Sequence, residues 1–174
     1  MTRAFVFLDR DGTLIEDRGY HYQLADYAPL AGAYEAVRAL RAARFGTAIV
    51  TNQSGIARGF FGEADFARFQ AHLLADFAAH GAAIDASYHC PHLPDAGCEC
   101  RKPRPGLLLR AQRELGADLA RSWVIGDLEC DVGLARAAGC AAVLLGPSGA
   151  PRADGVALAP DVLAAAQLVL AEAR

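Results

Sequence analysis

Short apolar runs alternate with amphipathic segments along the whole chain, and this alternation is the strongest constraint on its fold. Nearly continuous apolar runs, typical of strands buried on both faces, occupy residues 4–9, 47–52, 84–90, 122–127 and 141–146. Apolar residues at helical spacing occupy residues 33–45, 63–80, 105–116, 132–139 and 160–173. The pattern predicts an α/β fold, a Rossmann-like doubly wound parallel sheet with helices on both faces. We expect a single domain over residues 1–174, in which residues 146–155 form a loop before the last helix.

The composition argues against several kinds of partner. A formal net charge of −3 and a hydrophobic content of 53% indicate a globular protein without the basic face of a nucleic-acid binder. No apolar run approaches the roughly 18 residues of a membrane helix. The N-terminal segment reaches two aspartates too early for a signal peptide. We therefore expect a cytoplasmic monomer that binds neither nucleic acid nor membranes and whose thiols stay reduced.

Polar side chains follow four of the predicted strands at their carboxyl ends, where parallel sheets bind ligands. They are Asp9 and Asp11 after the first strand, Thr51, Asn52, Gln53 and Ser54 after the second, Arg101 and Lys102 beyond the third, and Asp127 after the fourth. Each has an ordinary explanation alone, since D-x-D-G can be a solvated turn and threonine favours strands. Such groups at four successive strand ends instead indicate one active site.

These residue types suit phosphoryl transfer. Two close carboxylates, Asp9 and Asp11, repel one another unless they share a proton or a cation, and oxygen ligands favour magnesium. One carboxylate can attack phosphorus to form an aspartyl-phosphate, while the other protonates the leaving oxygen and later deprotonates water. Thr51 and Lys102 can bind the transferred group, and Asp127 can complete the magnesium site with Asp9.

A cysteine-rich loop, "CPHLPDAGCECRKP", covers residues 90–103. Its four candidate metal ligands are Cys90, His92, Cys98 and Cys100. Three thiolates and one imidazole make a closed tetrahedral set for structural zinc, with no open position for water. The alternative is a loop that contains cysteines by chance. Zinc there would stiffen the loop, so that Arg101 and Lys102 reach the substrate from a fixed place.

The segments DRDGT, VTNQS, RKP and GDLECD resemble the four motifs of the haloacid-dehalogenase-type phosphatases, in the same order and on the expected strands. The resemblance runs roughly from Phe5 to Gly146. It implies that Asp9 is the nucleophile and Asp11 the general acid/base. It also implies that Thr51 and Lys102 steady the phosphate, and that magnesium binds Asp9, Asp127 and the backbone carbonyl of Asp11.

The cysteine-rich loop and "TNQSGIARG" narrow the resemblance to the zinc-containing heptose-bisphosphate phosphatases, which are small and capless. This family implies removal of the 7-phosphate of D-glycero-D-manno-heptose 1,7-bisphosphate, a phosphorylated sugar, in ADP- or GDP-heptose precursor biosynthesis. The implied substrate contacts are Asp17, Arg18, Gly19, Tyr20, Thr51, Asn52, Gln53, Ser54, Arg101 and Lys102. Arg101 would grip the distal phosphate. Leu128 departs from members that carry lysine there, which leaves the preferred anomer open.

Three other interpretations stay open. A histidinol-phosphate phosphatase of the same superfamily shares the zinc loop and "CRKP", but its substrate carries one phosphate. A binding protein on a decayed phosphatase fold conflicts with the complete set of catalytic residues. A phosphotransferase or mutase normally needs a cap that excludes water, and the segments after Asp11 and Asn52 leave no room for one. We further expect Asp131 to cap a helix or support the magnesium site, and Cys130 to be a buried small hydrophobe.

Overall fold

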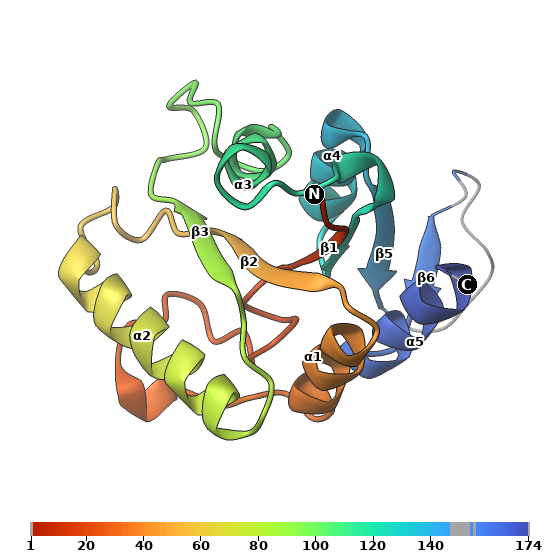
Figure 1. Ribbon diagram of the computed structural model, residues 1–174. Helices are drawn as coiled ribbons and strands as arrows, with labels where there is room; N and C mark the ends of the chain where they lie inside the picture. Colours follow the sequence, from red (N-terminus) through yellow and green to blue (C-terminus); the bar gives the residue numbers. More distant parts are fainter. Residues whose placement is uncertain (1, 147–153, 155, 174) are drawn as a thin grey trace.

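The computed structural model describes residues 2–146, 154 and 156–173, and a parallel sheet with strand order β3-β2-β1-β4-β5-β6 forms its centre (Figure 1). The strands are β1 (Phe5–Leu8), β2 (Gly46–Asn52), β3 (Ala86–Cys90), β4 (Trp123–Gly126), β5 (Ala141–Leu145) and β6 (Ala157–Ala159). In register, Phe7 of β1 lies between Ala48 of β2 and Val124 of β4. The chain leaves β1 toward β2 on one side and returns to β4 on the other. The carboxyl ends of β1 and β4 therefore form the topological switch point, where such sheets bind ligands.

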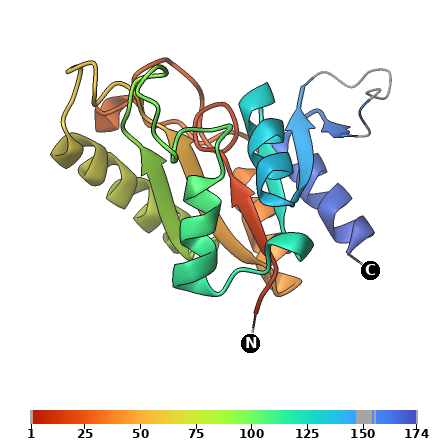
Figure 2. The same cartoon turned by 90° about the horizontal axis from the view of Figure 1, so that it is seen from above.

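Helices cover both faces of the sheet (Figure 2). They are α1 (Ala33–Ala42), α2 (Glu63–Ala79), α3 (Gly106–Leu115), α4 (Glu129–Ala138) and α5 (Val162–Glu172), with short 3-10 helices η1 (Leu24–Asp26) and η2 (Leu119–Arg121). Val6 and Leu8 of β1 pack in the core beneath α1, α2 and α5, whereas Phe5 and Phe7 pack beneath α3 and α4. Because both faces are buried, the strands read as continuous apolar runs.

The predicted fold class is confirmed, and the differences are the bounds of some elements and one additional short strand. Helix α4 begins at Glu129, three residues before the predicted start at Val132, because the side chain of Asp131 accepts the backbone N–H of Leu128 and closes the first turn. Strand β6 was not predicted, since it consists of only three small or apolar residues. Most of the predicted loop at 146–155 lies outside the described residues.

The segments that follow β1 and β2 are short. Between β1 and α1 the described chain forms only η1 and isolated bridges such as Asp11 with Ile15, and no cap domain is inserted there or before α2. Within the described residues, no helix combines the length and apolar character needed to cross a membrane. The carboxyl edge of the sheet is therefore framed by loops, which form the site below.

Candidate active site

A cleft of about 140 Å³ opens at the carboxyl ends of β1 and β2. It is lined by Asp9, Asp11, Asp17, Gly19, Tyr20, Thr51, Asn52, Gln53, Ser54, Lys102, Leu128 and Cys130. The predicted substrate contacts thus converge on one cavity, apart from Arg18 and Arg101. Arg18 extends outward to Glu16, where its Nη2 lies 2.6 Å from Oε2. The guanidinium of Arg101 donates to the backbone carbonyl of His92 at 3.2 Å.

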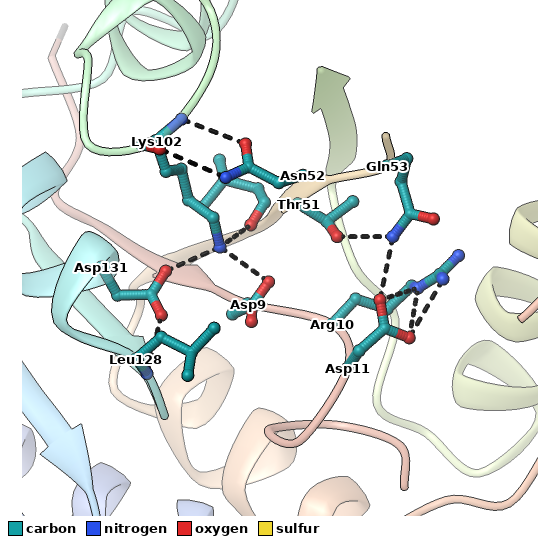
Figure 3. A network of polar contacts seen from close by, with 10 residues as sticks. Asp9, Arg10, Asp11, Thr51, Asn52, Gln53, Lys102, Leu128 and Asp131 are labelled. Atoms are coloured by element: carbon teal, nitrogen blue, oxygen red, sulfur yellow. Dashed lines mark hydrogen bonds and ion pairs between the residues drawn. The ribbon is translucent and has the colours of Figure 1, made fainter. Parts of the chain in front are cut away.

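Lys102 is the cation at the floor of the cleft (Figure 3). Its side chain is only 2% exposed, and its Nζ lies 2.8 Å from Oδ1 of Asp9 and 2.6 Å from Oδ1 of Asp131. It also donates to the carbonyl of Val50 at 3.2 Å. Burial acts to lower the pKa of Lys102, but the charges of Asp9 and Asp131 outweigh it and raise the pKa. The lysine is therefore a fixed positive charge beside Asp9.

An acidic cluster faces this lysine. Carboxylate oxygens of Asp9, Asp127 and Asp131 all lie within 4.8 Å of one another. Burial and the neighbouring charge of Asp9 raise the pKa of Asp127 to about 7. Burial also raises the pKa of Asp131 to about 6, although Lys102 opposes this.

The acidic cluster fits a bound cation. Oδ1 of Asp127 is buried and has no hydrogen-bond partner among the described residues. A buried carboxylate oxygen without a partner is costly, and close carboxylates repel. An oxygen-only donor set of this kind suits magnesium, which would satisfy that oxygen and relieve the repulsion.

Two glycines make the close approach of these carboxylates feasible. A Cβ on Gly12, which has φ +79°, would lie 2.3 Å from Oδ2 of Asp127. A Cβ on Gly126 would lie 2.2 Å from Oδ2 of Asp131. Any larger residue at either position would push an acidic side chain out of the cluster. The glycines in "DRDGT" and "VIGD" therefore serve the geometry of the acidic cluster.

Asp11 points away from this acidic cluster, toward Arg10 and Gln53 (Figure 3). Nε of Arg10 lies 3.0 Å from its Oδ1 and 3.1 Å from its Oδ2, and Nε2 of Gln53 donates to Oδ2 at 2.9 Å. The same amide donates to Oγ1 of Thr51 at 2.8 Å. Burial raises the pKa of Asp11, while the charge of Arg10 opposes the rise.

Asn52 lines the cleft, but its amide holds the backbone of Lys102. The N–H of Lys102 donates to Oδ1 of Asn52 at 3.0 Å, and Nδ2 of Asn52 donates to the carbonyl of Lys102 at 3.3 Å. This pair of bonds resembles one step of a sheet ladder and joins the end of β2 to the loop that follows β3. Asn52 therefore fixes the place from which the lysine side chain enters the cleft.

The cysteine-rich loop brings its four predicted ligands together between β3 and α3 (Figure 1). Sγ of Cys90 lies 3.6 Å from Sγ of Cys98 and 3.5 Å from Nδ1 of His92, and that nitrogen lies 3.3 Å from Sγ of Cys100. A disulfide requires about 2.0 Å between sulfurs. A tetrahedron with zinc–sulfur bonds of about 2.3 Å has edges of roughly 3.5–3.8 Å. The spacing therefore fits four ligands around one metal ion.

The three cysteines of this loop differ in acidity: burial raises the pKa of the Cys90 thiol to about 12 and also raises that of Cys100, whereas the pKa of Cys98 is lowered. Burial acts to raise the pKa of the Cys98 thiol, but the backbone N–H groups of Arg101 and Cys100 and the neighbouring thiols lower it to about 7. A thiol of this kind ionises readily, and metal binding requires the thiolate.

Three residues have roles that the sequence left open or missed. Asp131 both caps α4 and pairs with Lys102, because its two oxygens face different partners. Cys130, expected to be buried, is partly exposed and lines the cleft. Arg10 was not singled out, yet its side chain is fully buried beside Asp11. Alternation along β1 carried a signal for it, since Arg10 continues the face of Val6 and Leu8 toward α2.

The switch point, the acidic cluster and the buried lysine define the class of this chain, the haloacid-dehalogenase-like (HAD-like) hydrolases. A family model described as HAD-hydrolase-like matches residues 99–168. The segment includes the lysine and the carboxylates of α4 and its preceding turn.

Known proteins that are similar over most of this chain identify the family within this class. A D-glycero-beta-D-manno-heptose-1,7-bisphosphate 7-phosphatase from Yersinia pestis is 42% identical over 166 residues, which cover 91% of this chain and 88% of the relative. A D-glycero-alpha-D-manno-heptose-1,7-bisphosphate 7-phosphatase from Campylobacter jejuni is 44% identical over 127 residues, 73% of each chain. The crystal structure of a D,D-heptose 1,7-bisphosphate phosphatase from B. bronchiseptica, complexed with magnesium and phosphate, matches with a TM-score of 0.86 and 32% identity over 97% of this chain and 99% of that one. The chain belongs to the family of heptose-1,7-bisphosphate 7-phosphatases.

Proposed function

We propose that this protein is a magnesium-dependent phosphatase that removes the 7-phosphate of D-glycero-D-manno-heptose 1,7-bisphosphate. The observation that carries the proposal is the position of Asp9 in a small cleft, where its carboxylate contacts the Lys102 ammonium and lies within 4.8 Å of carboxylate oxygens of Asp127 and Asp131. Family membership supplies the substrate class, since relatives with both anomer names are similar to this chain. We further propose a cytoplasmic monomer that supplies ADP- or GDP-heptose precursors.

In the proposed mechanism, the carboxylate of Asp9 attacks the phosphorus of the 7-phosphate. The bond from phosphorus to the sugar oxygen breaks, and that oxygen takes a proton from Asp11. Asp11, now a carboxylate, takes a proton from water, whose oxygen attacks phosphorus and breaks the bond to Asp9. The products are the heptose 1-phosphate and inorganic phosphate.

The remaining groups bind charge that the phosphoryl group carries during transfer. The hydroxyl group of Thr51 donates a hydrogen bond to the phosphoryl oxygens, and Lys102 supplies a positive charge in the cleft. Magnesium held by Asp9, Asp127 and the backbone carbonyl of Asp11 would supply charge neutralisation between the nucleophile and the phosphate. Asp131 accepts a hydrogen bond of 2.6 Å from the Lys102 ammonium and so holds it in place.

We also propose that Cys90, His92, Cys98 and Cys100 hold a structural zinc ion. Their mutual distances support four ligands around one metal, and a complete set of protein ligands leaves no coordination position for catalysis. The loop runs directly into Lys102, whose backbone is also held by Asn52. Zinc would fix the backbone at Cys100, and Asn52 fixes it at Lys102, two residues further along the chain.

Arg101 is proposed to bind the distal phosphate of the bisphosphate. Its guanidinium makes a hydrogen bond of 3.2 Å to the carbonyl of His92 at an exposed position. Such a bond is weaker than a bidentate contact between arginine and phosphate, so the substrate could draw the side chain toward the cleft.

The test is phosphate release from both anomers of the heptose bisphosphate, fructose 1,6-bisphosphate and histidinol phosphate, with and without magnesium. We expect release from at least one heptose anomer to exceed that from the other two substrates by about a hundredfold in kcat/KM, and to require magnesium. Preference for histidinol phosphate would support the alternative phosphatase. Absence of turnover on all four substrates would refute the proposed activity.

A further inference from the structure

Arg10 is a buried cation with a restricted set of partners. Its side chain is 0% exposed, and its guanidinium lies over the rings of Phe66 and Phe69 of α2, at 5.6 and 5.0 Å from their centroids. Its polar contacts are to Asp11, through Nε and through Nη2 at 3.0 Å from Oδ1. Neither Nη1 nor Nη2 makes a hydrogen bond among the described residues, so the Nη2 contact is an ion pair and only Nε donates hydrogen bonds.

An arginine at this position is costly unless its charge serves a purpose. Burying a guanidinium requires removing its water, and a leucine or methionine would fill the space beneath α2 at lower cost. The aromatic rings return part of that cost through cation–π attraction and hold the guanidinium plane in place. What the charge adds, beyond packing, is its contact with Asp11.

Asp11 is held at both carboxylate oxygens. Oδ1 faces Nε and Nη2 of Arg10, while Oδ2 faces Nε of Arg10 and the amide of Gln53. The carboxyl group still lines the cleft, but it is not part of the acidic cluster around Asp9. Gln53 also donates a hydrogen bond to Thr51 of β2. Contacts with both β2 and α2 therefore fix the orientation of Asp11.

We propose that Arg10 is a positioning residue: clamped by the aromatic rings of α2, it sets the orientation from which Asp11 delivers its proton to the leaving oxygen. The inference rests on the proposed function, in which Asp11 is the general acid. Helix α2, which contributes no side chain to the cleft lining, acquires a role in catalysis through Phe66 and Phe69.

The test uses the dependence of turnover on the leaving group. The variant Arg10→Lys keeps a positive charge but lacks the Nε–H group that contacts both oxygens of Asp11, and it lacks the planar guanidinium that packs against the rings. We expect kcat/KM for the heptose bisphosphate to fall by about 10- to 100-fold, the worth of a hydrogen bond to a charged group. This parameter reports the steps up to release of the leaving group and excludes the later attack of water, in which Asp11 also acts. The kcat/KM for p-nitrophenyl phosphate should fall by less than about threefold, because its leaving group needs no proton.

Two further variants keep the test decisive if Arg10→Lys does not fold. Phe66→Leu and Phe69→Leu each remove one ring from the clamp without changing a polar group. Each should lower activity more on the heptose bisphosphate than on p-nitrophenyl phosphate, by a smaller factor than Arg10→Lys does. Leu73→Val, a buried change on the same helix, is the matched control and should affect both substrates equally. Melting temperatures of all variants separate lost orientation from lost fold.

Equal losses of kcat/KM on the two substrates, in Arg10→Lys or in the phenylalanine variants, would overturn the positioning role. Asp11→Asn, assayed in parallel, separates this outcome from failure of the proposed function. If Asp11→Asn lowers kcat/KM selectively for the heptose bisphosphate while the Arg10 and phenylalanine variants lower it equally for both substrates, only the inference about Arg10 fails. If Asp11→Asn lowers kcat/KM equally on both substrates, Asp11 is not the acid, and the proposed mechanism fails with the inference.

Discussion

Replacing Asn52 by alanine should impair catalysis through Lys102. The change removes two hydrogen bonds to the backbone of Lys102, of 3.0 and 3.3 Å, both partly buried. At about 0.5–1.5 kcal/mol each, their loss amounts to about 1–3 kcal/mol of stability. The lysine side chain keeps its contacts to Asp9 and Asp131, so the fold should survive. We expect kcat to fall by about 10- to 100-fold, since a shift of about 1 Å in a catalytic group has effects of this size.

A double-mutant cycle is the assay that separates this route from a direct contact with substrate. In a Lys102→Met background, Asn52→Ala should reduce kcat by less than about threefold, because the group that it positions is already absent. Asn52→Asp keeps the acceptor for the Lys102 N–H but loses the donor, and should lie between wild type and alanine. Reductions of kcat that simply multiply in the double mutant would refute the positioning of Lys102 by Asn52 and return Asn52 to the substrate contacts.

Three further predictions concern protons, zinc and the distal phosphate. The raised pKa values of Asp127, about 7, and Asp131, about 6, mean that the metal-free folded protein binds protons more tightly than the unfolded chain. Its stability in magnesium-free buffer should therefore fall as pH rises from about 4 to about 7, and magnesium should reverse this fall in thermal unfolding. Stability that rises over this range would contradict the assignment. Elemental analysis should find about one zinc per chain, and Cys98→Ser should lower both the zinc content and the melting temperature, whereas Cys140→Ser, outside the metal-binding loop, should keep the zinc. Arg101→Ala should raise KM for the heptose bisphosphate by about 10- to 100-fold and leave KM for a heptose monophosphate nearly unchanged, and equal changes on both would exclude a distal-phosphate contact.

The sheet could be predicted because burial on both faces leaves a clear pattern. Phe5 and Phe7 pack on one side of β1 and Val6 and Leu8 on the other, so the strand has no polar positions to obscure it. Strand β6 has only three residues, too few for such a pattern to be distinct from an apolar loop. Element ends such as that of α4 depend on a capping side chain whose partner is known only from the fold.

Site residues at the ends of strands could be placed from the sequence, whereas the direction of side chains on irregular loops could not. Asp9 follows β1 directly and Thr51 lies near the carboxyl end of β2, and the order of the strands brings them to one edge. Arg101 lies on an irregular loop, where the neighbouring lysine faces the cleft and the arginine turns to the carbonyl of His92. The direction of a side chain on such a loop depends on contacts that lie far away in the sequence.

The same limit applied to Asp131. Its partner Lys102 precedes it by 29 residues, and no local pattern links an aspartate in the first turn of α4 to that lysine. Arg10 is the converse case, because alternation along β1 does place it on the face covered by α2. What the sequence could not supply was the presence of two aromatic rings on that face at the height of the guanidinium.

The central claim is that Asp9 becomes phosphorylated during turnover. The most direct measurement is acid quenching of the enzyme during turnover of the heptose bisphosphate in the presence of magnesium, followed by peptide mapping of the phosphorylated residue by mass spectrometry. We predict phosphate on the peptide that contains Asp9, and neither phosphopeptide nor turnover in Asp9→Asn. Phosphate on a different residue, or an Asp9→Asn variant that retains turnover within tenfold of wild type, would contradict the proposed mechanism.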